Sequence, residues 1–143
     1  QLGMDCPFFI ENVPALSTGR GELLTPVSLM LSGMYLLIVK PLVHVSTAAA
    51  FSGIKPMLRE NSIHEITSLP VHEWRKLLHN DFESTVMALY PETGEIKNEL
   101  YRKGAVYAAL SGSGSAVFGL FEKPVSLEFA GCDVFGTLLG SQL

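Results

Sequence analysis

The chain has 143 residues, 48% of them hydrophobic, which excludes a disordered protein and leaves room for one domain with a substantial core. Fourteen acidic and ten basic residues give a net charge of −4, and the scattered basic residues argue against nucleic-acid binding. The longest apolar stretch, residues 29–39, is too short for a membrane span, which takes roughly 20 residues, and no secretion signal is visible. We therefore expect a cytoplasmic protein without a membrane or nucleic-acid partner.

The first third of the chain predicts short strands. Residues 7–10 and 13–16 are apolar runs separated by a turn, and residues 23–27 follow a polar loop as another short strand. Residues 34–39 (MYLLIV) form the best candidate for a buried strand, which we expect to end at Lys40-Pro41 because proline removes a backbone donor.

The middle of the chain predicts helices. Ser46 and Thr47 precede three alanines as an N-cap signal, with Gly53 as the stop, and residues 55–67 predict a loop or a ragged helix. Apolar residues recur at helical spacing over 70–89, where the run 80–83 (NDFE) indicates a break or a new capping box. Another helix is expected from Pro91 to about Lys103.

The most informative segment is residues 104–121 (GAVYAALSGSGSAVFGLF), in which two apolar runs predict strands joined by the loop 111–115. Glycines at 112 and 114 permit positive φ, and successive N–H groups with serine hydroxyls could form an anion cradle. A tight β-turn and a flexible linker are the alternatives. The loop matches neither a Walker A motif nor a dinucleotide fingerprint. Together with a last apolar stretch, 125–139, the elements predict an α+β domain with an antiparallel sheet.

Few polar residues outside this loop suggest chemistry. Asp5 lies among apolar neighbours, where a buried carboxylate could accept a hydroxyl proton, although an exposed turn residue would explain it equally simply. His72 and His79 have no third ligand at a metal spacing, and NDFE fits helix capping better than cation binding. Phe51 could stack on a base or belong to the core. Cys6 and Cys132, near opposite ends, predict reduced thiols.

Residues 104–121 resemble the C-terminal glycine-rich motif of the superfamily of galactokinases, homoserine kinases, mevalonate kinases and phosphomevalonate kinases. More narrowly, the chain resembles the C-terminal half of the 4-diphosphocytidyl-2-C-methyl-D-erythritol kinases. Residues 3–9 (GMDCPFF) are similar to that family's G-x-D-V-P-F-F segment, and residues 18–22 (TGRGE) to its G-x-G-E turn. Residues 40–51 (KPLVHVSTAAAF) are similar to P-G-V-x-V-S-T-x-x-A-F, and residues 80–83 match N-D-F-E.

The resemblance implies a ferredoxin-like domain with helices packed on one face of the antiparallel sheet. It implies Asp5 as the catalytic base, and Thr47 and Phe51 as contacts to the cytidine end of a cytidine diphosphate-linked methylerythritol. It also implies a phosphate or substrate loop that consists of Gly112, Ser113, Gly114 and Ser115. ATP and Mg²⁺ would be the cofactors of the parent kinase, held mainly by residues outside this chain, and no metal ligand is assigned here.

The resemblance also implies a domain organisation. Residues 1–27 would be a remnant of the N-terminal kinase domain that carries the catalytic Asp, and residues 28–143 the C-terminal domain. The chain alone should then fold but be inactive, because the missing N-terminal half carries the other glycine-rich motif. Leu42 stands where the family usually has glycine, Cys6 replaces valine, and the tail after Phe121 lacks the usual charged helix. Another kinase of the superfamily, of the homoserine or mevalonate type, and a non-catalytic α+β ligand-binding module are the alternative functions.

Overall fold

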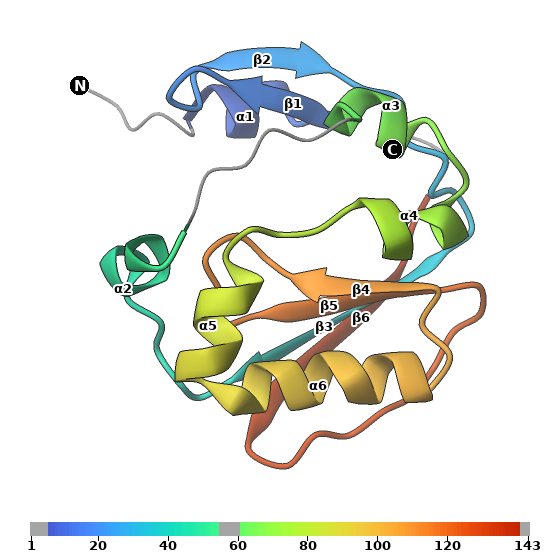
Figure 1. The fold of residues 1–143 in the computed structure, drawn as a ribbon. Coiled ribbons are helices and arrows are strands. Elements are labelled where there is room, and N and C mark those ends of the chain that lie inside the picture. Colours follow the sequence, from blue (N-terminus) through green and yellow to red (C-terminus); the bar gives the residue numbers. More distant parts are fainter. Residues whose placement is uncertain (1–5, 55–60, 141–143) are drawn as a thin grey trace.

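The computed structural model describes residues 6–54 and 61–140 of the chain (Figure 1). Along these residues, a short helix is followed by three strands, then by five helices and finally by three more strands. The strands are β1 (Ala15–Thr18), β2 (Leu23–Pro26), β3 (Tyr35–Pro41), β4 (Tyr107–Leu110), β5 (Val117–Phe121) and β6 (Cys132–Leu138). The helices are α1 (Cys6–Glu11), α2 (Thr47–Ser52), α3 (Ile63–Thr67), α4 (Val71–Leu77), α5 (Glu83–Leu89) and α6 (Pro91–Arg102).

The main sheet has four strands in the order β4-β5-β3-β6, and every neighbouring pair is antiparallel. In this register Val39 lies opposite Val117 of β5 on one side and Val134 of β6 on the other. This is the ferredoxin-like order, in which the first strand lies between the last two. The structure therefore confirms the α+β class and the antiparallel sheet.

Both faces of this sheet are covered, because successive residues of a strand point to opposite faces. On one face, strand residues such as Ala108 and Val117 pack with Val86 of α5 and Leu100 of α6. These α5 and α6 contacts match the expected helix layer. On the other face, Tyr107 and its neighbours pack with residues of α3 and α4, so the sheet carries a second helix layer (Figure 1).

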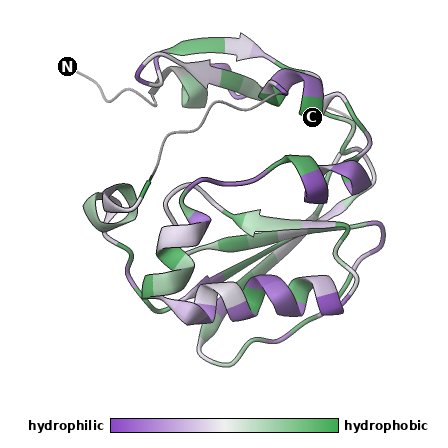
Figure 2. Cartoon of the chain, in the orientation of Figure 1, coloured by the Kyte–Doolittle hydropathy of each residue, from purple (hydrophilic) through white to green (hydrophobic). Residues whose placement is uncertain are grey.

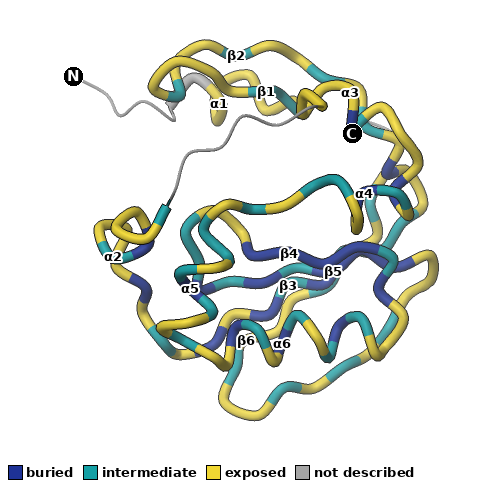
Figure 3. The backbone as a smooth tube through the Cα atoms, viewed as in Figure 1, coloured by how far each residue is buried: buried dark blue, intermediate teal, exposed yellow. Residues whose placement is uncertain are grey.

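The first strands form a separate two-stranded hairpin, β1-β2, in which Ala15 lies opposite Pro26. Figure 3 shows the residues of these two strands as exposed or intermediate and none as buried, whereas the central strands of the main sheet are mostly buried. The hydropathy colouring in Figure 2 places apolar residues along the buried strands and polar residues on the outer side of α6.

Several local predictions were confirmed and others were wrong. The helix 47–52 has Ser46 as its N-cap and Gly53 as its C-cap, as predicted, and residues 63–67 form the short helix α3 with Ser62 and Glu65 as a capping box. The first apolar run is helix α1 instead of a strand.

Strand β3 runs on to Pro41, whereas the predicted strand ended at Val39. The ladder with β5 does stop at Val39, and only the β6 side continues to Pro41. The connection between β5 and β6, residues 122–131, contains no helix, which agrees with the missing charged helix noted in the sequence. Nowhere in 6–54 or 61–140 is there a helix with the length and apolar character needed to cross a bilayer.

Candidate functional site

The loop 111–115 is a tight turn between β4 and β5. The Gly114 N–H donates to the Ser111 carbonyl at 2.9 Å, and the Ser111 N–H donates to the Ala116 carbonyl at 2.8 Å. Gly112 has φ +55° and Gly114 has φ +86°, which is the left-handed region that favours glycine. The loop is therefore a tight β-turn, which was one of the two alternatives to an anion cradle. It is too constrained to be a flexible linker, which was the other.

Part of the predicted anion cradle is already used inside the fold. The N–H groups of Ser111 and Gly114 are bonded within the turn, and the hydroxyl of buried Ser115 donates to the Val43 carbonyl at 2.7 Å. The structure thus removes Ser115 from the donors available to a ligand. The space beside Gly112 is open, since a Cβ on this residue would meet nothing within 4 Å.

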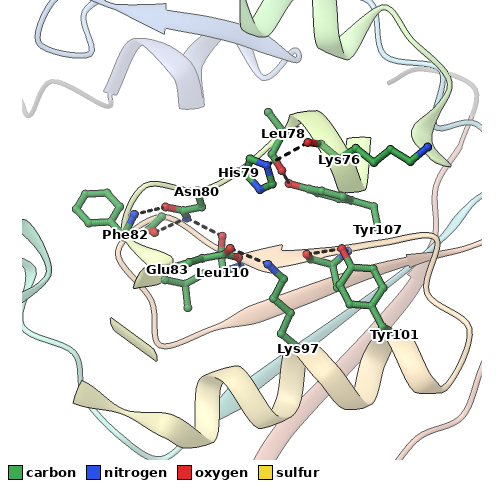
Figure 4. Close-up of polar contacts among 12 residues, drawn as sticks. Lys76, Leu78, His79, Asn80, Phe82, Glu83, Lys97, Tyr101, Tyr107 and Leu110 are labelled. Atoms are coloured by element: carbon green, nitrogen blue, oxygen red, sulfur yellow. Dashed lines mark hydrogen bonds and ion pairs between the residues drawn. The ribbon is translucent and has the colours of Figure 1, made fainter. Parts of the chain in front are cut away.

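The run 80–83 holds the beginning of this loop (Figure 4). The side-chain amide of Asn80 donates to the carbonyls of Leu110 and Gly112, both at 2.8 Å, while its oxygen accepts from the Phe82 N–H at 2.9 Å. Glu83 accepts from the Leu110 N–H at 2.9 Å with one oxygen and pairs with Lys97 Nζ at 2.6 Å with the other. The helical run is broken before α5, as one alternative predicted, whereas the capping box is wrong because the Glu83 carboxylate bonds to β4 and α6 instead of the Asn80 backbone.

These contacts complete the outer edge of β4. A strand at the edge of a sheet has N–H and C=O groups without a neighbouring strand, and proteins cover them in various ways. Here the Tyr101 hydroxyl donates to the Ala108 carbonyl and accepts from the Ala108 N–H, both at 3.1 Å. Two residues later along the strand, Asn80 donates to the Leu110 carbonyl and Glu83 accepts from the Leu110 N–H. Side chains from α6 and the 80–83 run thus take the place of a further strand.

Tyr107, on the opposite face of β4, stays protonated. Burial, the nearby Glu83 carboxylate and Tyr101 raise its pKa far above its ordinary value. Its hydroxyl donates to the Leu78 carbonyl at 3.3 Å, and its ring meets Trp74 edge-on at 5.7 Å. We assign Tyr107 to the packing of α4 on the sheet.

The predicted cytidine-contacting residues lie on helix α2. Thr47 and Phe51 are four residues apart, which places them on one face of the helix, and both are exposed. The Phe51 side chain is 60% exposed, so the core alternative for this residue was wrong. Its ring meets the Phe82 ring edge-on, with centroids 4.9 Å apart and planes at 88°.

The structure therefore brings Phe51 and the 111–115 loop together through the 80–83 run. Asp5 lies outside the described residues. The His79 Nε2–H donates to the Lys76 carbonyl at 3.2 Å, and His72 pairs with Glu73 on the exposed side of α4, which agrees with the helix-end interpretation. Among the described residues there is no group of three or more His, Cys, Asp or Glu side chains arranged for a metal ion.

Two departures from the family pattern can be placed. Leu42 is 80% exposed, and the one non-glycine residue with positive φ in the described part of the chain is Asn12, so the turn after β3 accommodates leucine without strain. Cys132 is a free cysteine, and burial together with Asp133 raises the pKa of its thiol. The side chain of Cys6 is not among those that the structure describes.

A cavity of about 430 Å³ lies elsewhere, between α6 and residues 129–132. Its walls include Glu92, Glu95 and Ile96 of α6, together with Phe129. None of the predicted site residues that the structure describes lines this cavity. The candidate site stays at the 111–115 loop and α2, because Asn80 bonds to the beginning of the loop and Phe82 contacts the Phe51 ring of α2.

Sequence reasoning missed the residues that hold Glu83, the edge of β4 and the loop. Lys97 pairs with Glu83, Tyr101 bonds to Ala108 of β4, and Val43 accepts from Ser115 of the loop; these contacts connect different elements, so no local spacing marks them. Glu83 was noticed only as a cap. Its place in a run that matches a family motif was the one available signal.

Comparison with known proteins decides the family. The model for the family described as "GHMP kinases C terminal" matches residues 63–134, half of the chain. The chain belongs to the GHMP kinases. The match covers α3 to the start of β6, and so includes both the 80–83 run and the 111–115 loop.

Curated relatives narrow the likeness within the GHMP kinases. A 4-diphosphocytidyl-2-C-methyl-D-erythritol kinase of Bacteroides fragilis is 51% identical over 141 residues, which cover 96% of this chain and 52% of the relative. The kinase of the same name from Bacteroides thetaiotaomicron is 54% identical over 121 residues, 85% of this chain and 44% of the relative. The chain thus spans about half the length of the curated relatives it matches.

Solved structures of two GHMP kinases have a similar fold. A crystal structure of 4-(cytidine 5'-diphospho)-2C-methyl-D-erythritol kinase superimposes with a TM-score of 0.73 at 28% identity, over 85% of this chain and 46% of that one. A homoserine kinase from Cytophaga hutchinsonii superimposes with a TM-score of 0.57 at 17% identity, over 84% of this chain and 46% of its own. The second likeness shows the shared GHMP fold alone.

Proposed function

We propose that this chain is the C-terminal half of an ATP-dependent kinase that phosphorylates a hydroxyl of 4-diphosphocytidyl-2-C-methyl-D-erythritol in non-mevalonate isoprenoid biosynthesis. The observation that carries the proposal is the 51% identity over 141 residues to the Bacteroides fragilis kinase of that name. The exposed Phe51 ring, linked to the constrained 111–115 loop through Phe82 and Asn80, supports it, because a nucleobase platform and a phosphate loop are the parts such a substrate needs.

In the proposed reaction the acceptor hydroxyl attacks the γ-phosphorus of ATP, and the bond from that phosphorus to the β–γ bridging oxygen breaks to release ADP. Asp5 takes the hydroxyl proton as the general base. Gly112 and Ser113 present backbone N–H groups toward the phosphate or the closing substrate, while Gly114 gives the loop its turn and Ser115 anchors it. When bound, Mg²⁺ would neutralise phosphate charge; the proposal assigns no ligand for it to this chain.

Residues 1–27 would belong with the N-terminal domain of the parent, and residues 28–143 would be the C-terminal domain. The exposed apolar side chains of the first segment support this division: Phe9 is 74% exposed, Ile10 78% and Leu23 59%. Unpartnered apolar residues of this density mark a surface that another part of a protein covers. We place the parent protein in the cytoplasm.

The test uses the full-length protein that contains this chain, with ATP and three acceptors: the cytidyl substrate, homoserine and mevalonate. We expect turnover with the first alone, and none from the isolated 143 residues. Asp5→Asn should lower turnover about 10²–10⁴-fold and leave the dissociation constant of the cytidyl substrate nearly unchanged. Asp133→Asn, on the exposed part of β6, is the matched control and should turn over as the wild type does.

Each alternative has its own result. Turnover of homoserine or mevalonate in place of the cytidyl substrate would make the protein another GHMP kinase. Wild-type turnover by Asp5→Asn would show that Asp5 is not the general base, while the proposed kinase activity would stand. Binding of the substrate without any turnover by the full-length protein would favour the non-catalytic ligand-binding module. A further check is the coding sequence upstream of Gln1, where we expect a G-x-G-L-G-G-G-S-S-like motif.

A further inference from the structure

The 80–83 run touches both parts of the site, and the proposed function gives it no role. We propose that Asn80 and Phe82 are positioning residues that hold the Phe51 ring and the 111–115 loop in a fixed relation. This inference rests on the proposed function, in which the ring binds the nucleobase and the loop faces the phosphates. Neither residue is assigned to the reacting atoms.

Asn80 is held by three hydrogen bonds that only an amide can make together. Its nitrogen donates to the carbonyls of Leu110 and Gly112, and its oxygen accepts from the Phe82 N–H. Aspartate has the same shape but no donor, and it would place a carboxylate against two carbonyl oxygens. The position of Gly112 therefore depends on the amide nitrogen of Asn80.

Phe82 supports the Phe51 ring by an edge-on contact. The two rings are in edge-to-face contact, and Phe82 also packs against the core cluster between the sheet and α6. Because Phe51 is 60% exposed, it has few other groups to fix its ring. Helix α2 lies close against α5 at this point, since a Cβ on Gly53 would collide with the Thr85 side chain.

A second connection closes a ring of contacts. Ser115, at the far end of the loop, is 6% exposed and donates to the carbonyl of Val43, in the segment that leads into α2. The loop is thus tied to α2 from its first residues through Asn80 and Phe82, and from its last residue through Val43. Two independent attachments restrict both translation and rotation of the loop relative to the Phe51 ring.

The test measures steady-state kinetics of the full-length protein with Phe82→Leu and Asn80→Asp. Phe82→Leu removes the ring but keeps an apolar side chain, so we expect the KM for the cytidyl substrate to rise about two- to tenfold, with kcat and the KM for ATP within twofold of wild type. Asn80→Asp displaces the loop, so kcat should fall about 10- to 100-fold with a smaller change in the KM for the cytidyl substrate.

Controls separate positioning from general damage. Phe135→Leu on exposed β6 and Asn98→Asp on the exposed side of α6 make the same chemical changes away from the site and should match the wild type. Phe82→Tyr keeps the ring and should restore the KM for the cytidyl substrate. Should Asn80→Asp not fold, the Phe82 pair decides the proposal by itself.

The outcomes are distinct. A wild type that phosphorylates no cytidyl substrate overturns the proposed function. An active wild type with Phe82→Leu equal to its Phe135→Leu control overturns the positioning inference alone. Equal proportional loss of kcat and rise of both KM values in Phe82→Leu and Phe82→Tyr would show damage to the fold, and would also overturn it.

Discussion

The ion pair between Glu83 and Lys97 should stabilise the fold far more than a surface pair does. The two charged groups are 2.6 Å apart, and their side chains are only 12% and 21% exposed. Exposed pairs contribute about 0–1 kcal/mol, and removing one partner of a fully buried pair costs about 3–5 kcal/mol. Since this pair lies between the two cases, we expect Glu83→Gln or Lys97→Met to cost about 2–3 kcal/mol.

The physical reason is that each single change leaves a mostly buried charge without its partner. A glutamine at 83 can still accept from the Leu110 N–H, but the Lys97 ammonium keeps its burial and loses its counter-charge. The double variant Glu83→Gln/Lys97→Met removes both charges. It should therefore be no less stable than either single variant, which gives a coupling of at least about 2 kcal/mol.

Urea unfolding of this chain, followed by the fluorescence of its single tryptophan, Trp74, gives these free energies. In thermal unfolding a loss of 2–3 kcal/mol corresponds to a Tm lower by roughly 6–9 °C. The control is the exposed pair of Glu73 and Lys76, 3.9 Å apart, where Lys76→Met should cost less than about 0.5 kcal/mol. Single variants that each cost under about 0.5 kcal/mol, or that add without coupling, would refute the reasoning.

Two further predictions concern local structure. Hydrogen bonds from the backbone and hydroxyl of Ser62 hold the pKa of Glu65 below its ordinary value, so this capping contribution is present at neutral pH and is lost as the pH falls through that lowered pKa. An NMR titration should show that Ser62→Ala raises this pKa; an unchanged value would contradict the capping box. Gly114→Ala should destabilise the chain by about 1–2 kcal/mol because φ is +86°, whereas Gly94→Ala, inside α6 with ordinary contact to Met87, should stabilise it by about 0.5–1 kcal/mol. Equal effects of the two substitutions on urea unfolding would be incompatible with this backbone assignment.

The sequence allowed the elements with strong periodic or turn signals to be predicted. The segment around the 111–115 loop, the helix from Pro91 and the strand beginning near Met34 all have local patterns that survive in the fold. Residues 7–10 were mistaken for a strand, because a four-residue apolar run carries no period that distinguishes a strand from a helical turn, and Pro7 suits the first turn of a helix.

The site was predictable only in part, for a different reason. Thr47 and Phe51 could be named from a motif and do lie on one helix face, but nothing local shows that Phe82 supports the Phe51 ring. Likewise, the carboxylate of Glu83 satisfies the cap pattern in sequence and is used on β4 in space. Contacts across such separations depend on the sheet register, which a single sequence does not display.

The central position of β3 has a consequence for how the domain folds during synthesis. Its partners on both sides, β5 and β6, are made long after it: Tyr35 pairs with Phe121 and with Leu138. During synthesis the apolar strand around Leu37 therefore stays unpaired until β5 has left the ribosome. In that interval α5, α6 and β4 are synthesised and can pack locally. Pairing of strands so far apart is slow, and an apolar strand exposed meanwhile is a target for chaperones or for aggregation. We infer that the ribosome-bound chain is most vulnerable in the interval between the emergence of β3 and that of β5.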